Sequence, residues 1–295
     1  MFDYILYKIG QFIVLHLPLK MGYKIAVFIS DLHYLFAAED RLNVTENLKA
    51  IFPEKSDREI HSIRIRMFRN FAKYLVDFLC FSKMNMQYLK SNIKVEDIHY
   101  LDDALSKGKG VIALSAHLGN WELGAAAIAT LGYPIWVVAL THKHKQVNNL
   151  FNLQRQSKGV GVIPLGMAVR QCLELFGKNE IIALVGDRDF NERGAVVDFF
   201  GRPTFFPVGP AGFALKTQAS IVPVFIFRNK DDTFTLKFEK PIECAWHPDT
   251  KEGHISKSDK DKQIMDLIRR YKVIIEGYIR KYPDQWFMFR RFWIS

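Results

Sequence analysis

The segment Val111-Ile-Ala-Leu-Ser-Ala-His-Leu-Gly-Asn-Trp-Glu122 indicates both the fold and the chemistry of this chain. Residues 111–114 form a short, continuous apolar run, which is typical of a strand buried on both faces of a sheet. From residue 120 the chain continues to residue 131 as a predicted helix of small residues. Because α/β sheets place their ligand sites at the carboxyl ends of strands, His117 is predicted to face a substrate.

Apolar runs and amphipathic segments alternate after this point. Strands are predicted at 135–140, 161–165, 181–185, 221–227 and 234–239, the last with the alternation of an antiparallel edge strand. Helices are predicted at 145–158, 168–176, 210–218 and 263–280, and residues 186–209 form a loop with Gly and Pro. Residues 39–105 carry apolar side chains at helical spacing. The pattern predicts an α/β fold in which helices flank a mixed central sheet.

The N-terminus contains two apolar runs, at residues 9–19 and 25–30, and neither is long enough to span a bilayer. Residues 2–36 are aromatic-rich and flanked by lysines, a pattern of helices that lie in a membrane interface. Packing against the rest of the protein is the alternative, and both could hold on different faces. We therefore expect interfacial helices at 1–36 and a single α/β domain at 37–295. The aromatic cluster 286–293 is predicted to be a second bilayer contact.

Composition allows several partners. Of the 295 residues, 49% are hydrophobic, so a large core is available, and the net charge is +10. A basic surface suits nucleic acid, anionic lipid or an acidic protein. The charge is spread along the chain without a recognition motif, so nucleic acid is not a predicted partner.

The candidate catalytic residues are His117 and Glu122. A carboxylate can hold an imidazole in one tautomer, provided that His117 lies in the turn before the helix. The alternative is a structural histidine. The sequence has no metal-binding pattern and no Gly-x-Ser-x-Gly motif, so no metal is predicted. Direct attack by an acceptor hydroxyl on an activated acyl group needs only one general base.

A second polar cluster, Asp187-Arg188-Asp189, follows another predicted strand. It is either a solvated turn or an arginine cradle for phosphate. Further along, Gly209 precedes a predicted helix, whose amino end could receive an anion. Backbone amides near Gly119 or at 209–211 are candidates for stabilising an oxyanion.

Several blocks in this order resemble the bacterial lipid A late acyltransferase family, lauroyl and myristoyl transferases included, and the related phosphatidylinositol mannoside acyltransferases. The blocks are Arg41-Leu-Asn43, Asn47-Leu48, Phe52-Pro53, Ser115-Ala-His-Leu-Gly-Asn-Trp-Glu122, Asp187-Arg-Asp189, Val197-Asp-Phe-Phe-Gly201, Gly209-Pro-Ala211, Tyr282-Pro-Asp-Gln-Trp286 and Arg290-Arg-Phe292. Residues 139–147 lack the Arg-Pro of many lipid A enzymes. The Asp187 and Gly209 blocks resemble the mannoside branch more closely.

The resemblance implies a glycerolipid acyltransferase-like fold, with His117 as the base and Glu122 as its partner. It implies no cofactor, an acyl donor on acyl carrier protein or coenzyme A, and attachment to the cytoplasmic face of the bacterial inner membrane, peripheral or monotopic. The acceptor would be a hydroxyl of a membrane glycolipid, foremost a lipid A precursor, with a phosphatidylinositol mannoside or another glycolipid or phospholipid as the alternative. Substrate-binding residues would be Asn120, Arg155, Asp187, Arg188, Asp189 and Gly209.

Two further expectations follow. Apolar walls from Trp121, Phe199 and Phe200 would receive the acyl chain. A membrane-surface protein that has kept the scaffold and lost catalysis is the non-enzymatic alternative.

Overall fold

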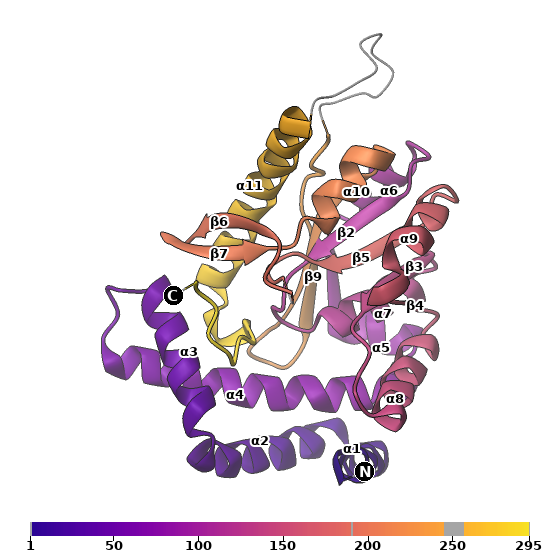
Figure 1. Ribbon diagram of the computed structural model, residues 1–295. Coiled ribbons are helices and arrows are strands. Elements are labelled where there is room, and N and C mark those ends of the chain that lie inside the picture. The colour runs from indigo at the N-terminus through magenta and orange to yellow at the C-terminus, as the bar shows by residue number, and fades with distance from the viewer. Residues whose placement is uncertain (1, 190, 245–256, 295) are drawn as a thin grey trace.

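The computed structural model describes residues 2–189, 191–244 and 257–294. Among them, a seven-stranded sheet has the strand order β1-β9-β8-β2-β5-β3-β4, with helices on both faces (Figure 1). Strands β8, β2, β5, β3 and β4 are parallel, whereas β9 is antiparallel to β8. This confirms the mixed α/β class. The strands are β1 (Ile93–Glu96), β2 (Val111–Ser115), β3 (Ile135–Ala139), β4 (Gly161–Pro164), β5 (Ile181–Val185), β8 (Ser220–Arg228) and β9 (Phe234–Phe238).

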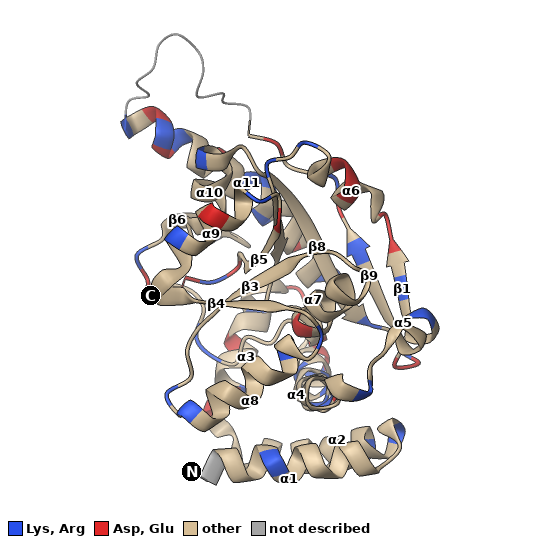
Figure 2. Cartoon of the chain, turned by 90° about the vertical axis from the view of Figure 1, so that its right-hand side faces the viewer, with Lys and Arg blue, Asp and Glu red and all other residues tan. Residues whose placement is uncertain are grey.

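The helices form an N-terminal group and a group that covers the sheet. Helices α1 and α2 lie against α4 at the end of the molecule opposite α10 (Figures 1 and 2). None of the described helices is both long and apolar enough to cross a membrane. The bounds are α1 (Phe2–His16), α2 (Leu19–Phe36), α3 (Ala38–Ile51), α4 (Asp57–Leu79), α5 (Met86–Asn92), α6 (His99–Leu105), α7 (Trp121–Thr130), α8 (Lys145–Gln156), α9 (Ala168–Phe176), α10 (Gly209–Thr217), α11 (Lys257–Lys281) and the short 3₁₀ turns η1 (Phe81–Lys83), η2 (Leu165–Met167) and η3 (Pro283–Gln285).

Three strands differ from the sequence-based expectation. Strand β1 lies in the segment predicted to be helical, and it pairs with β9, so β9 is not the edge. Strands β6 (Ala195–Phe199) and β7 (Arg202–Phe206) form a hairpin where a loop was predicted. Phe200 and Gly201 both have positive φ, as a tight two-residue hairpin turn requires. These short strands were missed in the sequence because four or five residues show too little side-chain alternation. Their pairing with a neighbouring strand defines them instead.

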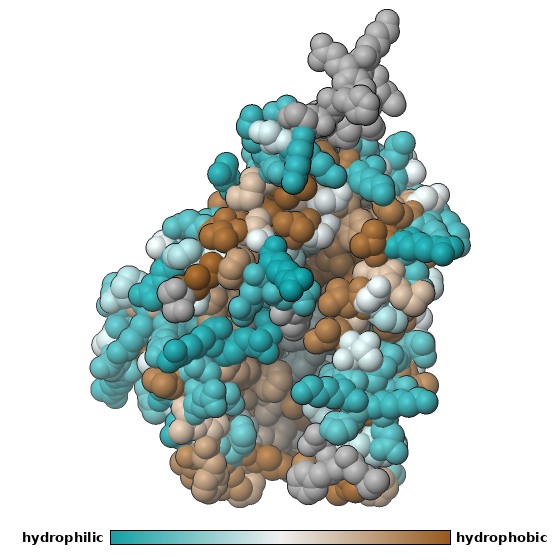
Figure 3. Space-filling view, in the orientation of Figure 1, coloured by the Kyte–Doolittle hydropathy of each residue, from teal (hydrophilic) through white to brown (hydrophobic). Residues whose placement is uncertain are grey.

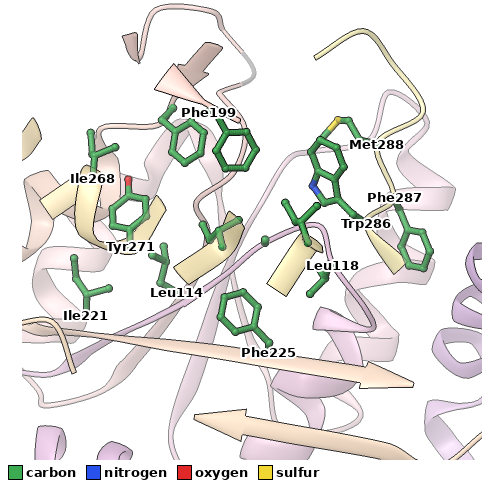
Figure 4. Close-up of a cluster of buried hydrophobic side chains, with 14 of the residues drawn as sticks. Leu114, Leu118, Phe199, Ile221, Phe225, Ile268, Tyr271, Trp286, Phe287 and Met288 are labelled. Atoms are coloured by element: carbon green, nitrogen blue, oxygen red, sulfur yellow. The ribbon is translucent and has the colours of Figure 1, made fainter. Parts of the chain in front are cut away.

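The core consists of one cluster on each face of the sheet. Successive residues of a strand point to opposite faces. Ile112 and Leu114 belong to the cluster beneath α9, α10 and α11, whereas Val111 and Ala113 belong to the one beneath α7 and α8. Figure 4 shows part of the first cluster, where Leu114 lies near aromatic side chains from distant segments. Burial on both faces explains the continuous apolar runs.

The turn after β2 requires glycine at position 119. Gly119 has a φ of +64°, and an added Cβ would lie 1.8 Å from the carbonyl oxygen of Ile226. Its backbone N–H donates to the carbonyl of Gln285 at 2.8 Å. The turn is therefore wedged between β8 and the C-terminal segment.

Gly119→Ala is expected to lower the free energy of unfolding by more than about 2 kcal/mol, because both the clash and the left-handed backbone penalise a side chain. Gly212→Ala in α10 is the matched control, since an added Cβ there meets no atom within 4 Å. Alanine in a helix interior should stabilise it by roughly 0.5–1 kcal/mol. Urea unfolding of both variants measures the difference. Equal stability of the two variants would contradict the wedged geometry.

Candidate active site

His117 and Asp187 are brought together by the pairing of two parallel strands. Ser115 at the end of β2 pairs with Val185 at the end of β5. Each functional residue lies two positions beyond its strand, so the two meet at the carboxyl edge of the sheet. His117 Nδ1 lies 2.8 Å from Asp187 Oδ1, and the His117 backbone N–H donates to Oδ2 at 3.0 Å. The position predicted for His117 at the strand end is confirmed.

Asp187 is the carboxylate that orients the imidazole, and it is fully buried. Burial alone would raise its pKa, but His117 and the hydrogen bonds from its ring, the Trp286 indole and the His117 amide hold the pKa of Asp187 below its ordinary value. An ionised carboxylate only accepts hydrogen bonds. The Nδ1 nitrogen is therefore the donor, and Nε2 carries the lone pair of the neutral ring.

The C-terminal segment holds the catalytic turn on its other side. Trp286 Nε1 donates to Asp187 Oδ2 at 3.0 Å, and Phe287 N donates to the carbonyl of His117 at 2.9 Å. Leu118 and Trp286 form an antiparallel bridge. Trp286 is completely buried, and Figure 4 shows it beside Leu118. Residues 286–288 are core residues, so the prediction that this part of the aromatic cluster contacts a bilayer is wrong.

Glu122 has a partner other than the predicted one. Its carboxylate accepts two hydrogen bonds from Arg155, at 2.9 Å from Nε and 2.5 Å from Nη2. Burial would lower the pKa of the Arg155 guanidinium, yet Glu122 raises it. The prediction that Glu122 orients His117 is wrong, because the strand-end carboxylate of Asp187 occupies that role. Arg155, which was predicted to bind phosphate, also donates to Asn152 and lines the cavity described below, so its phosphate-binding role stays a prediction.

Asn120 caps the helix that follows the turn. Its side-chain oxygen accepts from Leu123 N, while its Nδ2 donates to Asp77 Oδ2 at 2.8 Å. Asp77 is fully buried and also accepts from Tyr23 Oη of α2 at 2.5 Å and from the Arg228 guanidinium. Asn120 was predicted to bind substrate, but the structure places it in this buried network. Sequence patterns did not reveal Asp77.

The second predicted cluster divides into separate roles. Asp189 accepts backbone hydrogen bonds from Arg193 and Gly194, which is a turn-stabilising role. Arg188 is half-buried, and burial together with nearby Arg290 lowers the pKa of Arg188 to about 10. Gly209 is the first residue of α10. Arg188 therefore lies within electrostatic reach of the Arg290 cation and of the carboxylates of Asp187 and Glu192.

A cavity of about 480 Å³ opens at His117 and extends along the sheet face covered by α7 and α8. This volume lies within the range of small-molecule sites in proteins. Its polar lining residues include Ser115, Glu122 and Arg155. Most of the wall is apolar, with contributions from Ala113, Gly124, Ala125, Ile128, Ile135, Val137, Ala183, Val224 and Leu236.

Small residues create this space. Ala113 and Ala183 lie side by side on β2 and β5, and Gly124 and Ala125 of α7 also line the cavity. Trp121 lines the cavity as expected, and its ring centroid lies 5.3 Å from that of His117. The expected contribution of phenylalanines 199 and 200 is wrong, because neither lines the cavity: Phe199 belongs to the core cluster beneath α9, α10 and α11, and Phe200 packs against that cluster.

The backbone amide of Gly119 is committed to the carbonyl of Gln285 and that of Asn120 to Ile226. The prediction that an amide at Gly119 stabilises an oxyanion therefore does not fit this geometry. The amides at the start of α10 stay candidates.

Comparison with known proteins identifies several relatives. The sequence model of a family described as "Bacterial lipid A biosynthesis acyltransferase" matches residues 1–295. The chain is 27% identical over 230 residues to a phosphatidylinositol mannoside acyltransferase of Mycolicibacterium smegmatis, covering 77% of this chain and 70% of that protein. It is 23% identical to a lipid A biosynthesis acyltransferase of Haemophilus influenzae, covering 85% and 74%. The 1-acyl-sn-glycerophosphate acyltransferase PlsC of Thermotoga maritima aligns with a TM-score of 0.37 and 17% identity, covering 86% and 98%.

The depressed pKa of Asp187 predicts how stability depends on pH. A group whose pKa is lower in the folded state stabilises the fold above its unfolded pKa, about 3.9 for aspartate, and loses that contribution as pH falls through the folded value. The stability difference between the wild type and Asp187→Asn should be constant above about pH 5 and shrink below about pH 4. Urea unfolding across this range measures it, with exposed Asp103→Asn as the control. A difference that grows toward low pH would contradict the assignment.

Proposed function

Since this chain belongs to the bacterial lipid A biosynthesis acyltransferase family, we propose that it transfers a fatty acyl group from an acyl thioester to a hydroxyl of a membrane glycolipid. The observation that carries the proposal is a histidine held by a buried carboxylate at the opening of a largely apolar cavity. A polar catalytic group at one end of a lipid-compatible space suits a substrate with a reactive head and an alkyl tail.

In the proposed reaction, His117 is the general base. The acceptor hydroxyl donates a hydrogen bond to Nε2, which takes the proton as the oxygen attacks the thioester carbonyl. The new C–O bond forms, and the tetrahedral intermediate then breaks the C–S bond. The imidazolium returns its proton to the departing sulfur, leaving an ester and a free thiol. Asp187 stabilises the imidazolium that forms between these steps.

The acyl chain of the donor would occupy the cavity beneath α7. Each buried methylene contributes about 0.8 kcal/mol, so a chain that fills the cavity binds better than one that is shorter. Acyl carrier protein and coenzyme A both present the acyl group as a thioester, and either suits this reaction. No cofactor takes part in these steps.

The proposed acceptor is a lipid A precursor, because the family model matches the whole chain. A phosphatidylinositol mannoside is the second candidate, favoured by the relative of that name at 27% identity. Arg188 and Arg290, which lie within electrostatic reach of each other, would bind a phosphate of either lipid through charge-assisted hydrogen bonds. Supplying each purified acceptor with an acyl thioester and identifying the acylated lipid by mass spectrometry distinguishes them.

We also propose peripheral attachment to the cytoplasmic face of the inner membrane. Large apolar side chains stand exposed on α1 and α2, including Phe12, Phe28 and Phe36. Exposed apolar residues on helices that also carry lysines are typical of interfacial attachment.

His117→Ala is expected to lower turnover by at least about 10²-fold, the usual loss when a general base is removed. His144→Ala is the matched control, because His144 is exposed and does not line the cavity. Thioester consumption with a glycolipid acceptor measures both. Full turnover in a folded His117→Ala variant would contradict the mechanism and favour a scaffold that only binds lipid.

Ala113→Leu is expected to shift the preferred donor toward shorter acyl chains. Ala113 lies on β2 two residues before its end at Ser115, about 7 Å deeper along the strand than the start of the turn that carries His117. Every methylene that no longer fits should weaken binding about fourfold. A series of acyl thioesters of increasing length measures the preference, with the smaller change Ala113→Val as a second variant and exposed Ala38→Leu as the control. An unchanged preference in a folded Ala113→Leu variant would exclude the cavity as the acyl site.

A further inference from the structure

A second cavity, here called the N-terminal groove, lies outside the proposed reaction site. It has a volume of about 470 Å³ and is bounded by α1, α2, α4 and the ring of Phe289. Its wall is built almost entirely from apolar side chains and glycines, among them Ile13, Ala26, Ile29, Ala72 and Leu75.

Aromatic rings separate the N-terminal groove from the active-site cavity. Phe71 lines the groove, and its ring lies 5.3 Å from that of Phe287 and 5.6 Å from that of Tyr74. Tyr74 stacks on Trp121 at 4.8 Å, and both of these residues line the cavity at His117. The two spaces are therefore distinct sites on either side of one aromatic wall.

The surface around the N-terminal groove is also apolar. Ile29 both lines the groove and is 58% exposed, so the groove is continuous with the outer surface of α2. Figure 3 shows hydrophobic residues gathered along the lower edge of the molecule, where α1 and α2 lie in Figure 1. An apolar groove that opens onto an apolar surface suits a ligand that arrives from a hydrophobic phase.

Polar side chains lie at one end of the N-terminal groove and on the exposed surface of α2. Ser30, His33 and Asp40 are the polar members of the wall, and all three come from the region where α2 leads into α3. Lys20 and Lys24 stand exposed on α2, one helical turn apart. The polar end of the groove matches a ligand with a long apolar part and one polar end, and the two lysines near the start of α2 add positive charge that attracts an anionic surface.

The lining also distinguishes between kinds of occupant. A peptide in the groove would bury backbone N–H and C=O groups against apolar walls, where each one without a partner is costly. An alkyl chain has no such groups. We propose that the N-terminal groove binds one acyl chain of a bilayer lipid, which fastens the protein to the membrane; the inference rests on the membrane attachment proposed above.

Photolabelling tests this assignment. The full-length protein is bound to vesicles of phosphatidylcholine and phosphatidylglycerol that contain a trace of phosphatidylglycerol with a diazirine in its acyl chain. After irradiation, labelled residues are mapped by mass spectrometry. We expect labels on Ala72 and Leu75 of α4, which a bilayer touching only the outer surfaces of α1 and α2 would not reach. The experiment needs no turnover, so it can succeed even if the proposed acyl transfer fails.

Ala72→Phe should fill the groove and reduce labelling of α4 at least about tenfold, since a few methylene groups no longer fit. Ala72 belongs to neither core cluster, which favours folding of this variant. Ala38→Phe is the matched control, because position 38 is exposed and outside the groove. Phe28→Ala should weaken vesicle flotation while leaving α4 labelling per bound protein unchanged.

Three results would overturn the proposal. One is labelling of the wild type only on exposed α1 and α2 residues. Another is undiminished α4 labelling in folded Ala72→Phe. The third is failure of the wild-type protein to float with anionic vesicles. The wild-type labelling pattern decides the question even if Ala72→Phe does not fold.

Discussion

The buried carboxylate of Asp187 is the interaction on which the rest of the site depends. A charged group without water needs hydrogen-bond donors, and Asp187 receives them from the His117 ring, the His117 amide and the Trp286 indole. Meeting this requirement fixes the imidazole, the backbone of the turn and the C-terminal segment in one geometry. The geometry of the proposed catalytic histidine and the packing of the C-terminal segment thus have the same physical origin.

A second buried carboxylate connects the N-terminal helices to the same turn. Asp77 on α4 accepts from Tyr23 on α2, from Asn120 at the start of α7 and from Arg228 on β8. Removing Arg228, the ion-pair partner, would leave the buried Asp77 carboxylate without its counter-charge, a loss that typically costs about 3–5 kcal/mol. Helix α2 is therefore part of the folded core, although its outer surface exposes large apolar side chains. The expected packing of the N-terminal segment is therefore confirmed, whereas its contact with lipid stays a prediction.

The two faces of the sheet differ in side-chain size, and this difference places the cavity. Leu114 and Phe225 fill the face beneath α10 and α11, as Figure 4 shows. On the other face, Ala113, Ala183 and Gly124 leave space beside His117. Protein interiors are normally close-packed, so a space of this size needs small residues on facing elements. The aromatic wall at Tyr74 then keeps this cavity apart from the N-terminal groove.

The sequence by itself determined the mixed α/β class, most strands and helices, the family and the position of His117 at a strand end. These features depend on side-chain periodicity and on blocks that each lie within a few neighbouring residues. Only the tertiary structure decided the partners: Asp187 rather than Glu122 for His117, 70 residues away, and Trp286 for Asp187, 99 residues away. It also decided that β1 pairs with β9 and forms the edge of the sheet. Contacts between distant segments depend on how strands align and helices pack, and local patterns contain no record of either.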